Sequence, residues 1–319
     1  MSAAQQIESV LRPAGPISQV IAEMAWVVIL GGALVFAVVM AVLVWALARR
    51  REIPAGDDER ARTTWWWVVG GGFVFPVVVL SALLVYATLR TAWLTPARQP
   101  QELVITVSAR LWWWEVRYHE PARGIDVVLA NEIHLPVGRA ITLGLVSDDV
   151  IHSFWVPALA GKVDMVPGRV HQLRLQADRP GVFRGQCAEF CGEQHARMAL
   201  HVVAQGPEDF ERWLMLQTRP AEAPRDRQAQ LGLQVFTQQR CIVCHTVRGL
   251  GTALVPGPDL THIGSRLHLG AGTLPMGREA LKEWVGHTQR VKPGVRMPSY
   301  ERLDEASMQG LVVFLEQLR

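Results

Sequence analysis

The sequence predicts a membrane protein of mixed α and β structure: a hairpin of two transmembrane helices, then a β-sandwich or barrel, then an all-helical domain. Three observations support this fold class. Two long apolar segments lie near the N-terminus, short strand-like runs follow, and a Cys-x2-Cys-His motif stands in a helix-forming C-terminal part. The expected boundaries are 1–95 for the tail and membrane helices, 96–219 for the β-domain, 220–230 for a linker and 231–319 for the helical domain.

The composition indicates a membrane-anchored chain and argues against a nucleic-acid-binding one. Hydrophobic residues make up 50% of the 319 residues, and the mean hydropathy is positive, which is high for a soluble protein. A net charge of +3, without basic runs among aromatic residues, does not suggest nucleic acid as a partner. The four cysteines fall into two short motifs, so none is left for a structural framework between distant parts of the chain.

Two segments, at about 21–47 and about 64–89, are long and apolar enough to cross a bilayer. The loop between them carries five arginines, which places it on the cytoplasmic side and everything after about residue 95 on the outer side. The run 65–67 of three tryptophans is expected to anchor the second helix at the interface. Residues 1 to about 20 lack the apolar core of a secretory signal and are expected to stay in the mature chain.

The β-domain is predicted from short apolar or alternating runs at 103–109, 127–130, 141–145 and 170–175, separated by turn residues. Such spacing argues for a sandwich or barrel. Three tryptophans follow the first run. In an extended chain Trp112 and Trp114 face one way and Trp113 the other, so at least one ring is expected near the surface. The alternative is that all three pack in the core or cover the membrane interface.

A cluster of soft and borderline metal ligands lies near the end of the β-domain. Cys187, Cys191, His195 and Met198 fall within twelve residues, and His152 is a fifth candidate from a distant loop. Copper favours this set. The residues alone leave a disulfide, a structural zinc site and a Met that merely packs in the core open as alternatives. The thioether of Met198 favours copper, because zinc sites rarely use one.

The pattern Cys-x-Glu-x-Cys-x3-His-x2-Met, with Asp-x2-His upstream, resembles the dinuclear copper A centre of cytochrome c oxidase subunit II. The resemblance implies a cupredoxin-like fold in which two cysteine thiolates bridge two coppers. It implies the ligand set Cys187 and Cys191 as bridges, His152 and His195 as terminal imidazoles, and Met198 and the Glu189 carbonyl as weak ligands.

The same resemblance implies further roles around this centre. Trp112 matches the start of the family's aromatic patch for electron entry, and Glu189 and Asp149 match residues at a magnesium shared with catalytic subunit I. One feature of the family is missing. Many relatives carry a glutamate before the proline of the second membrane helix, but 68–71 holds no carboxylate. Other histidines of this domain are expected to be ordinary strand or turn residues: His119, His134, His171 and His201.

Cys241, Cys244 and His245 form the c-type haem attachment motif, in which two thiols add to the vinyl groups and the imidazole binds the iron. A redox dithiol is the alternative, but it needs an α/β context that is absent. For the second axial ligand we expect Met297, which Pro298 keeps on a loop. Met276 is disfavoured because it directly precedes 277–281, a run that indicates the start of a helix and would orient the Met276 side chain for packing. Weaker candidates are His262, His268 and His287.

The C-terminal part also resembles class I cytochrome c domains, with 257–260 similar to their proline segment and a final helix at 305–318 packed on the first helix. The resemblance covers nearly the whole chain. It implies a subunit that passes electrons from its own haem c to copper A and on to a haem of subunit I, for reduction of oxygen to water.

The implied setting is the bacterial inner membrane, with both metal domains on the periplasmic side. Expected partners are subunit I, other oxidase subunits and cytochrome c or another upstream donor. Opposite net charges predict that the two outer domains dock with the haem edge toward Trp112. Two alternatives are the equivalent subunit of a nitric oxide reductase and a copper chaperone. The haem motif, Met198 and the membrane helices argue against the chaperone.

Overall fold

The computed structural model describes residues 9–49, 57–92, 103–251 and 257–319. It divides into two compact units, one formed by Gln19–Gln99 and the other by Met1–Ser18 together with Pro100–Arg319. Among the described residues, the second unit contains two separate hydrophobic cores, one in the β-domain and one in the C-terminal helices.

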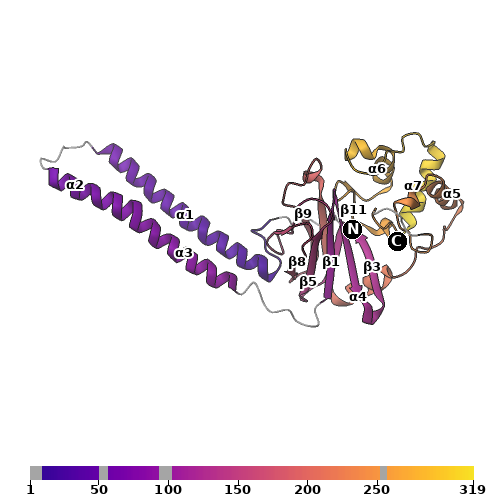
Figure 1. Ribbon diagram of the computed structural model, residues 1–319, viewed down its shortest axis with the longest axis horizontal. Coiled ribbons are helices and arrows are strands. Elements are labelled where there is room, and N and C mark those ends of the chain that lie inside the picture. Colours follow the sequence, from indigo (N-terminus) through magenta and orange to yellow (C-terminus); the bar gives the residue numbers. More distant parts are fainter. Residues whose placement is uncertain (1–8, 50–56, 93–102, 252–256) are drawn as a thin grey trace. The chain divides into compact units, whose positions relative to one another are not determined.

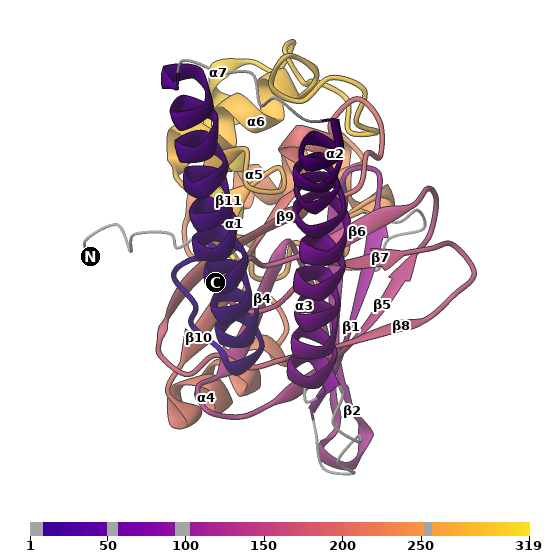
Figure 2. The ribbon, with the colours of Figure 1, turned by 90° about the vertical axis from the view of Figure 1, so that its left-hand side faces the viewer.

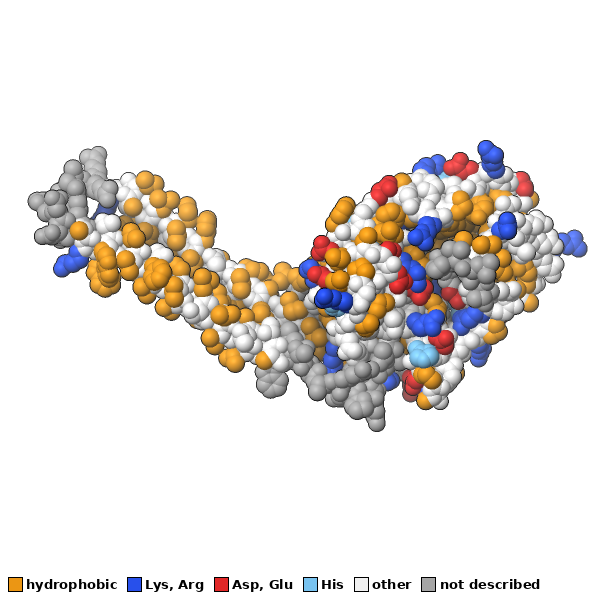
Figure 3. All heavy atoms as spheres, in the orientation of Figure 1, with side chains coloured by type: hydrophobic (Ala, Val, Ile, Leu, Met, Phe, Trp, Pro, Cys, Tyr) orange, Lys and Arg blue, Asp and Glu red, His pale blue; other side chains and the backbone are white. Residues whose placement is uncertain are grey.

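The first unit contains two long helical segments, α1 (Pro16–Ala48) and a run made of α2 (Asp57–Trp65), a π-helical stretch (Trp66–Val74) and α3 (Phe75–Thr91). Figures 1 and 2 show α1 and α3 as a pair. Both segments are apolar enough to span a membrane, over Pro16–Ala48 and Ala61–Thr91. Their side chains are largely exposed and hydrophobic (Figure 3), and Glu23 forms an ion pair with Arg90. Both membrane segments expected from the sequence fall within these helices.

The π-helical stretch lies just before Pro76, which cannot donate a backbone N–H and disturbs the regular helical bonding ahead of it. The glycines at 70–72 lie within this stretch. The arginine-rich connection lies partly outside the described residues, which exclude 50–56.

The described chain from 103 to 205 forms two five-stranded sheets, with the orders β3-β2-β1-β5-β8 and β4-β10-β9-β6-β7. Their inner faces bury Ile105, Trp114, Phe154 and Phe183 completely. Hydrophobic residues alternate with partly exposed ones along strands such as β3, as expected when one face is packed and the other meets water. The strands are β1 (Leu103–Arg110), β2 (Trp113–Glu120), β3 (Ile125–Ala130), β4 (Glu132–Pro136), β5 (Ile141–Ser147), β6 (His152–Trp155), β7 (Val163–Met165), β8 (His171–Leu175), β9 (Gly181–Cys187) and β10 (Ala199–Gln205).

The predicted sandwich is confirmed, and its connections explain where the candidate ligands lie. β6 pairs with β9, so that Phe154 stands opposite Cys187. β9 and β10 are antiparallel neighbours, and the loop between them carries the remaining candidate ligands. Helix α4 (Pro207–Gln217) follows and buries Phe210 and Leu214 in the same core.

The C-terminal part contains three helices, α5 (Arg227–Gln238), α6 (Arg278–Val291) and α7 (Glu305–Gln317), among its described residues. The helical domain was expected to begin at residue 231, but α5 begins at Arg227, because the carboxylate of Asp226 caps the helix by accepting from the Ala229 N–H at 2.8 Å. A two-stranded ribbon, β11 (His268–Leu269) and β12 (Leu274–Pro275), was not foreseen.

Helix α7 packs on α5, as expected for the final and first helices of this domain. The two helices cross at two glycines, Gly232 and Gly310. A Cβ atom placed on Gly232 would lie 2.0 Å from the carbonyl oxygen of Gly310. Only glycine permits so close an approach of the two backbones. The crossing places the start of the haem motif, which follows α5 in a 3-10 turn (Cys241–Val243), beside a firmly packed helix pair.

Candidate metal centres

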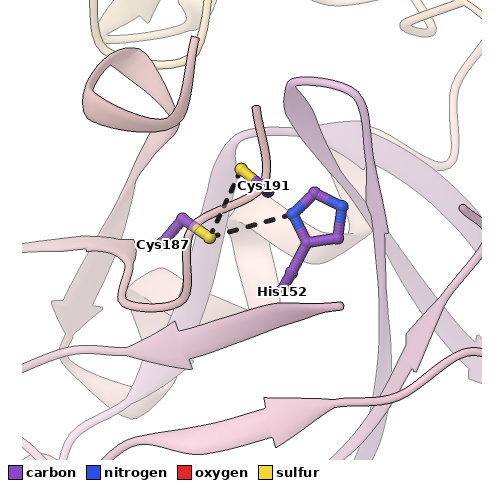
Figure 4. A group of neighbouring side chains, drawn as sticks. All are labelled: His152, Cys187 and Cys191. Carbon is purple, nitrogen blue, oxygen red and sulfur yellow. Dashed lines mark hydrogen bonds between the residues drawn. The ribbon is translucent and has the colours of Figure 1, made fainter. Parts of the chain in front are cut away.

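Two cysteines and a histidine converge at one end of the sandwich (Figure 4). Cys187 ends β9, Cys191 lies in the following loop and His152 begins β6. The two sulfur atoms are 3.8 Å apart, and Nδ1 of His152 is 3.8 Å from the Cys187 sulfur. All three residues are buried, and their ligand atoms lie within 4.8 Å of one another.

Three further donor atoms complete a near-symmetric arrangement around the sulfur pair. On the Cys191 side, Nδ1 of His195 lies 3.6 Å and Sδ of Met198 lies 3.8 Å from the Cys191 sulfur. On the Cys187 side, the carbonyl oxygen of Glu189 lies 3.2 Å from the Cys187 sulfur. The structure therefore brings together all six donors that the sequence pattern predicts.

The donor set fits two copper ions better than a disulfide or a zinc ion. A disulfide requires the sulfurs to lie about 2.05 Å apart, and here they are 3.8 Å apart. A structural zinc site uses four ligands from Cys, His and carboxylate. Six donors that include a buried thioether exceed that set and suit the soft-ligand preference of copper.

Asp149 orients the His152 ring. Its Oδ1 lies 2.7 Å from Nε2 of His152, and its Oδ2 accepts from the Leu111 N–H at 2.8 Å. Burial lowers the pKa of His152, but hydrogen bonds with Cys187 and Asp149 outweigh burial and raise it. Such an outer partner fixes which ring nitrogen is free to face a metal.

The sulfur pair is electrostatically coupled. The contact between the two thiols lowers the pKa of Cys187 and raises the pKa of Cys191. One proton is therefore lost much more readily than the second. A thiolate is the form that binds a metal.

Trp112 contacts the β9–β10 loop, which carries Cys191. Its Nε1 donates to the carbonyl oxygen of Cys191 at 2.8 Å. Trp112 belongs to the turn before β2, not to the strand, so strand alternation applies only to its neighbours. Trp114 is fully buried in the core, and Trp113 is partly exposed and lies under the guanidinium of Arg110.

The haem motif faces a cavity in the same compact unit. Nδ1 of His245 bonds the carbonyl oxygen of Pro258 at 2.9 Å, which leaves Nε2 free. Burial lowers the pKa of His245 and keeps the imidazole neutral, as an iron ligand must be. Gly257 packs so closely on the motif that a Cβ there would lie 2.4 Å from the Cys244 carbonyl oxygen.

The cavity is lined by the attachment cysteines, by His245 and, from the opposite segment, by Met297. Met276 does not line it, although both methionines contact the helical core. Met276 lies between β12 and α6, directly before the Gly277 N-cap, so the helix start expected just after Met276 is confirmed. The cavity also reaches the β-domain, where Trp112, Trp113 and Asp149 form part of its wall.

A glutamine that the sequence analysis missed holds the Met297 loop. The side-chain amide of Gln289 donates to the carbonyl oxygens of Met297 at 2.6 Å and Val295 at 2.7 Å, and its Oε1 accepts from the Gly294 N–H at 3.1 Å. The loop is thus held without helical bonds, as expected. A single Gln on α6 carries no motif that could have revealed this role.

Most of the other histidines contact named groups of the protein. His134 bonds Glu132 at 2.8 Å, His119 faces Asp126 and His287 faces Glu301. His262 lies 3.1 Å from the carbonyl oxygen of Arg219, and His201 stacks on His268 at a ring separation of 4.1 Å. His171 lies on β8.

Two known protein families match the second unit, one in the β-domain and one in the C-terminal helical part. The model for "Cytochrome C oxidase subunit II, periplasmic domain" matches residues 119–205, and the model for cytochrome c matches residues 229–319. Cytochrome c oxidase subunit 2 of Alkalihalophilus pseudofirmus is 34% identical over 315 residues, which cover 97% of this chain and 90% of that protein. The chain belongs to the cytochrome c oxidase subunit 2 family.

The subunit 2 protein of Bacillus sp. strain PS3 is 31% identical over 77% of this chain and 72% of its own length. The periplasmic domain of subunit II from Bradyrhizobium japonicum is 28% identical and covers 39% of this chain and 96% of that domain, with a TM-score of 0.35. Membership of the subunit 2 family makes this chain part of a haem–copper oxidase with a role in electron transfer. Its two domain families imply copper A and haem c, and family membership implies association with subunit I.

Proposed function

We propose that this chain is the electron-entry subunit of a respiratory terminal oxidase, passing electrons from its own haem c to copper A and on to the haem of subunit I, where oxygen is reduced to water. The single observation that carries the proposal is that Trp112 bonds the loop of the six-donor cluster and also lines the cavity of His245 and Met297. When bound, the two cofactors supply one-electron redox centres that need no bond making in this chain.

Cys187 and Cys191 would hold the two coppers as bridging thiolates, with His152 and His195 as terminal ligands. Met198 and the carbonyl of Glu189 would be the weak ligands. Support comes from the burial of the sulfur pair and from the placement of one imidazole beside each sulfur. Because the donors come from strand ends and one short loop of a packed sandwich, the protein would keep their geometry nearly fixed.

Cys241 and Cys244 would carry the haem covalently, with His245 and Met297 as the axial ligands. The Pro258 carbonyl orients His245, and Gln289 holds the loop of Met297. Trp112 would be the point at which electrons enter the copper site. Its ring contacts the copper loop, defined here as residues 187–198, and lines the haem cavity.

A magnesium site shared with subunit I would use the Glu189 carboxylate, for which the described part of the chain shows no hydrogen bond or ion pair. Asp149 is a weaker candidate, because both of its carboxylate oxygens already bind within the chain. The upstream donor would be a cytochrome c or a comparable small redox protein. The membrane would be the bacterial inner membrane, with both domains on its periplasmic side.

Electron paramagnetic resonance of the purified oxidised complex tests the copper assignment. One unpaired electron shared by two copper nuclei is expected, with two coppers that stay bound during chelation. A mononuclear copper spectrum, or a disulfide between Cys187 and Cys191 found by mass spectrometry, would overturn it. Offering oxygen and nitric oxide separately to the reduced complex would distinguish an oxidase from a nitric oxide reductase.

A further inference from the structure

One lysine is buried at the contact between the two outer domains. The sequence has three lysines. Lys162 and Lys282 are about half exposed, with side-chain exposures of 50% and 42%. Lys292, directly after α6, is 2% exposed. A buried lysine is costly unless its ammonium group finds partners, so Lys292 calls for a specific explanation.

The partners of Lys292 are three backbone carbonyls. Its Nζ donates to the oxygens of Trp112, Arg197 and Gly270, each at 2.8 Å. An ammonium group has three N–H donors, so every one is satisfied. Gly270 belongs to the haem domain, defined here as residues 227–319, whereas Trp112 and Arg197 belong to the β-domain. Burial, reinforced by Arg197, lowers the pKa of Lys292 to about 7.

The two carbonyls on the β-domain side flank the candidate copper ligands. Trp112 donates to the Cys191 carbonyl, and Arg197 stands between His195 and Met198. The contact is reciprocal, because the Arg197 guanidinium donates to the carbonyl of Val291, the neighbour of Lys292.

Backbone contact continues immediately past Met198. The Ala199 N–H donates to the Ala271 carbonyl at 3.0 Å. A Cβ on Gly272 would lie 2.9 Å from the Cβ of Ala199. The haem domain thus touches the end of the copper loop at main-chain distance, next to the carbonyls that Lys292 binds.

We propose that Lys292 is a positioning residue, which fixes the haem domain on the copper loop by binding main-chain carbonyls of both domains. This proposal rests on the proposed function. A charge-paired, solvent-exposed contact would allow the haem domain to dock and leave. The buried tripod of Lys292 instead holds one arrangement, because its release would leave three carbonyls and an ammonium group without partners in a dry site.

The test compares Lys292→Met with Lys282→Met in the purified full complex. Methionine keeps the length and packing of lysine but removes its donors. Lys282 lies on α6 with an exposed side chain paired to Glu305, so it is the matched control. Hydrogen exchange of the 197–201 segment, which contains the Ala199 amide, is measured together with haem-to-copper electron transfer after flash reduction.

Lys292→Met should speed exchange at Ala199 by roughly tenfold or more and slow electron transfer, because the contact then opens more often. Lys282→Met should change neither. Unchanged exchange in Lys292→Met, or slower transfer without faster exchange, would overturn the proposal. If the Lys292→Met complex does not assemble, Lys292→Gln, which keeps two donors, is judged by the same criteria.

Failure of both variants to assemble with haem and copper would also contradict the proposal, since Lys292 would then be needed for folding and not for positioning the haem domain. Absence of haem-to-copper transfer in the wild type would instead refute the proposed function.

Discussion

At the scale of single residues, the candidate ligands could be predicted from the sequence because metal binding requires particular atoms at particular spacings. The residues that hold these ligands in place could not be predicted in this way. Asp149 was expected at a magnesium site, yet it binds His152, while Gln289 and Lys292 gave no signal. Their roles depend on which carbonyls the fold brings to them, and any surface Gln or Lys looks the same in sequence.

The identity of the sixth haem ligand is testable at this scale. Met297→Leu should abolish the sulfur-to-iron charge-transfer absorption and lower the haem reduction potential, because a thioether opposite histidine raises it. Met276→Leu should leave both unchanged, since Met297 lines the haem cavity and Met276 does not. Visible spectra and redox titration of the two variants provide the measurement. The opposite pattern would assign the ligand to Met276.

The role of Asp149 predicts a loss of copper affinity. Asp149→Asn removes the charged partner of His152, and loss of such an outer partner typically costs roughly 10–100-fold in metal affinity. Competition with a copper chelator measures this change. Asp148→Asn is the control, because Asp148 pairs with Arg110 at 2.8 Å and does not contact His152. Equal affinities in the two variants would show that Asp149 does not support the ligand.

At the scale of elements, strands and membrane helices could be predicted because hydrophobic patterning reflects burial. Their ends could not always be predicted. The start of α5 depends on the Asp226 cap, and the β11–β12 ribbon is too short to produce a pattern. The contact between β10 and β11 could not be predicted either, since it stacks His201 on His268, two residues that lie far apart in the sequence.

This stacked pair predicts a pH-dependent contact. Burial lowers the pKa of His201 from 6.5 to about 4. The charges of His268 and Arg184 lower this pKa further, whereas the Glu132 carboxylate raises it. When the contact opens, His201 regains a pKa near 6.5, so the open state binds more protons between these values. The contact is therefore fully stable above pH 6.5 and weakens, by up to about 3 kcal/mol, as the pH falls toward 4.

Hydrogen exchange at Leu267, whose N–H donates to Glu132 across the same contact at 2.9 Å, measures this effect at pH 7.5 and pH 5. After correction for intrinsic exchange, protection should fall at pH 5 in the wild type. His201→Phe keeps an aromatic ring and should lose most of the difference. His119→Phe, with an exposed histidine, should behave as the wild type does. A wild-type protection factor independent of pH would contradict the assignment.

At the scale of the whole molecule, the order of the domains and the side on which they meet could be predicted from the sequence, but the residues that join them could not. Net charge suggested docking of the haem domain near Trp112. The structure places Trp112 on the wall of the haem cavity and adds buried links that net charge cannot reveal, including Arg266 with Glu132 at 3.5 Å. Such links suit a permanent donor, which replaces diffusive encounter with a high effective concentration.

The central claim is that electrons enter at the haem and then reach the copper pair within one chain. Rapid mixing of the oxidised complex with a reduced external cytochrome c, followed at haem and copper absorption bands, tests this order directly. We expect haem reduction first, with copper reduction following at a rate independent of complex concentration. Copper reduction ahead of the haem, or a haem that stays reduced while oxygen is consumed, would contradict it.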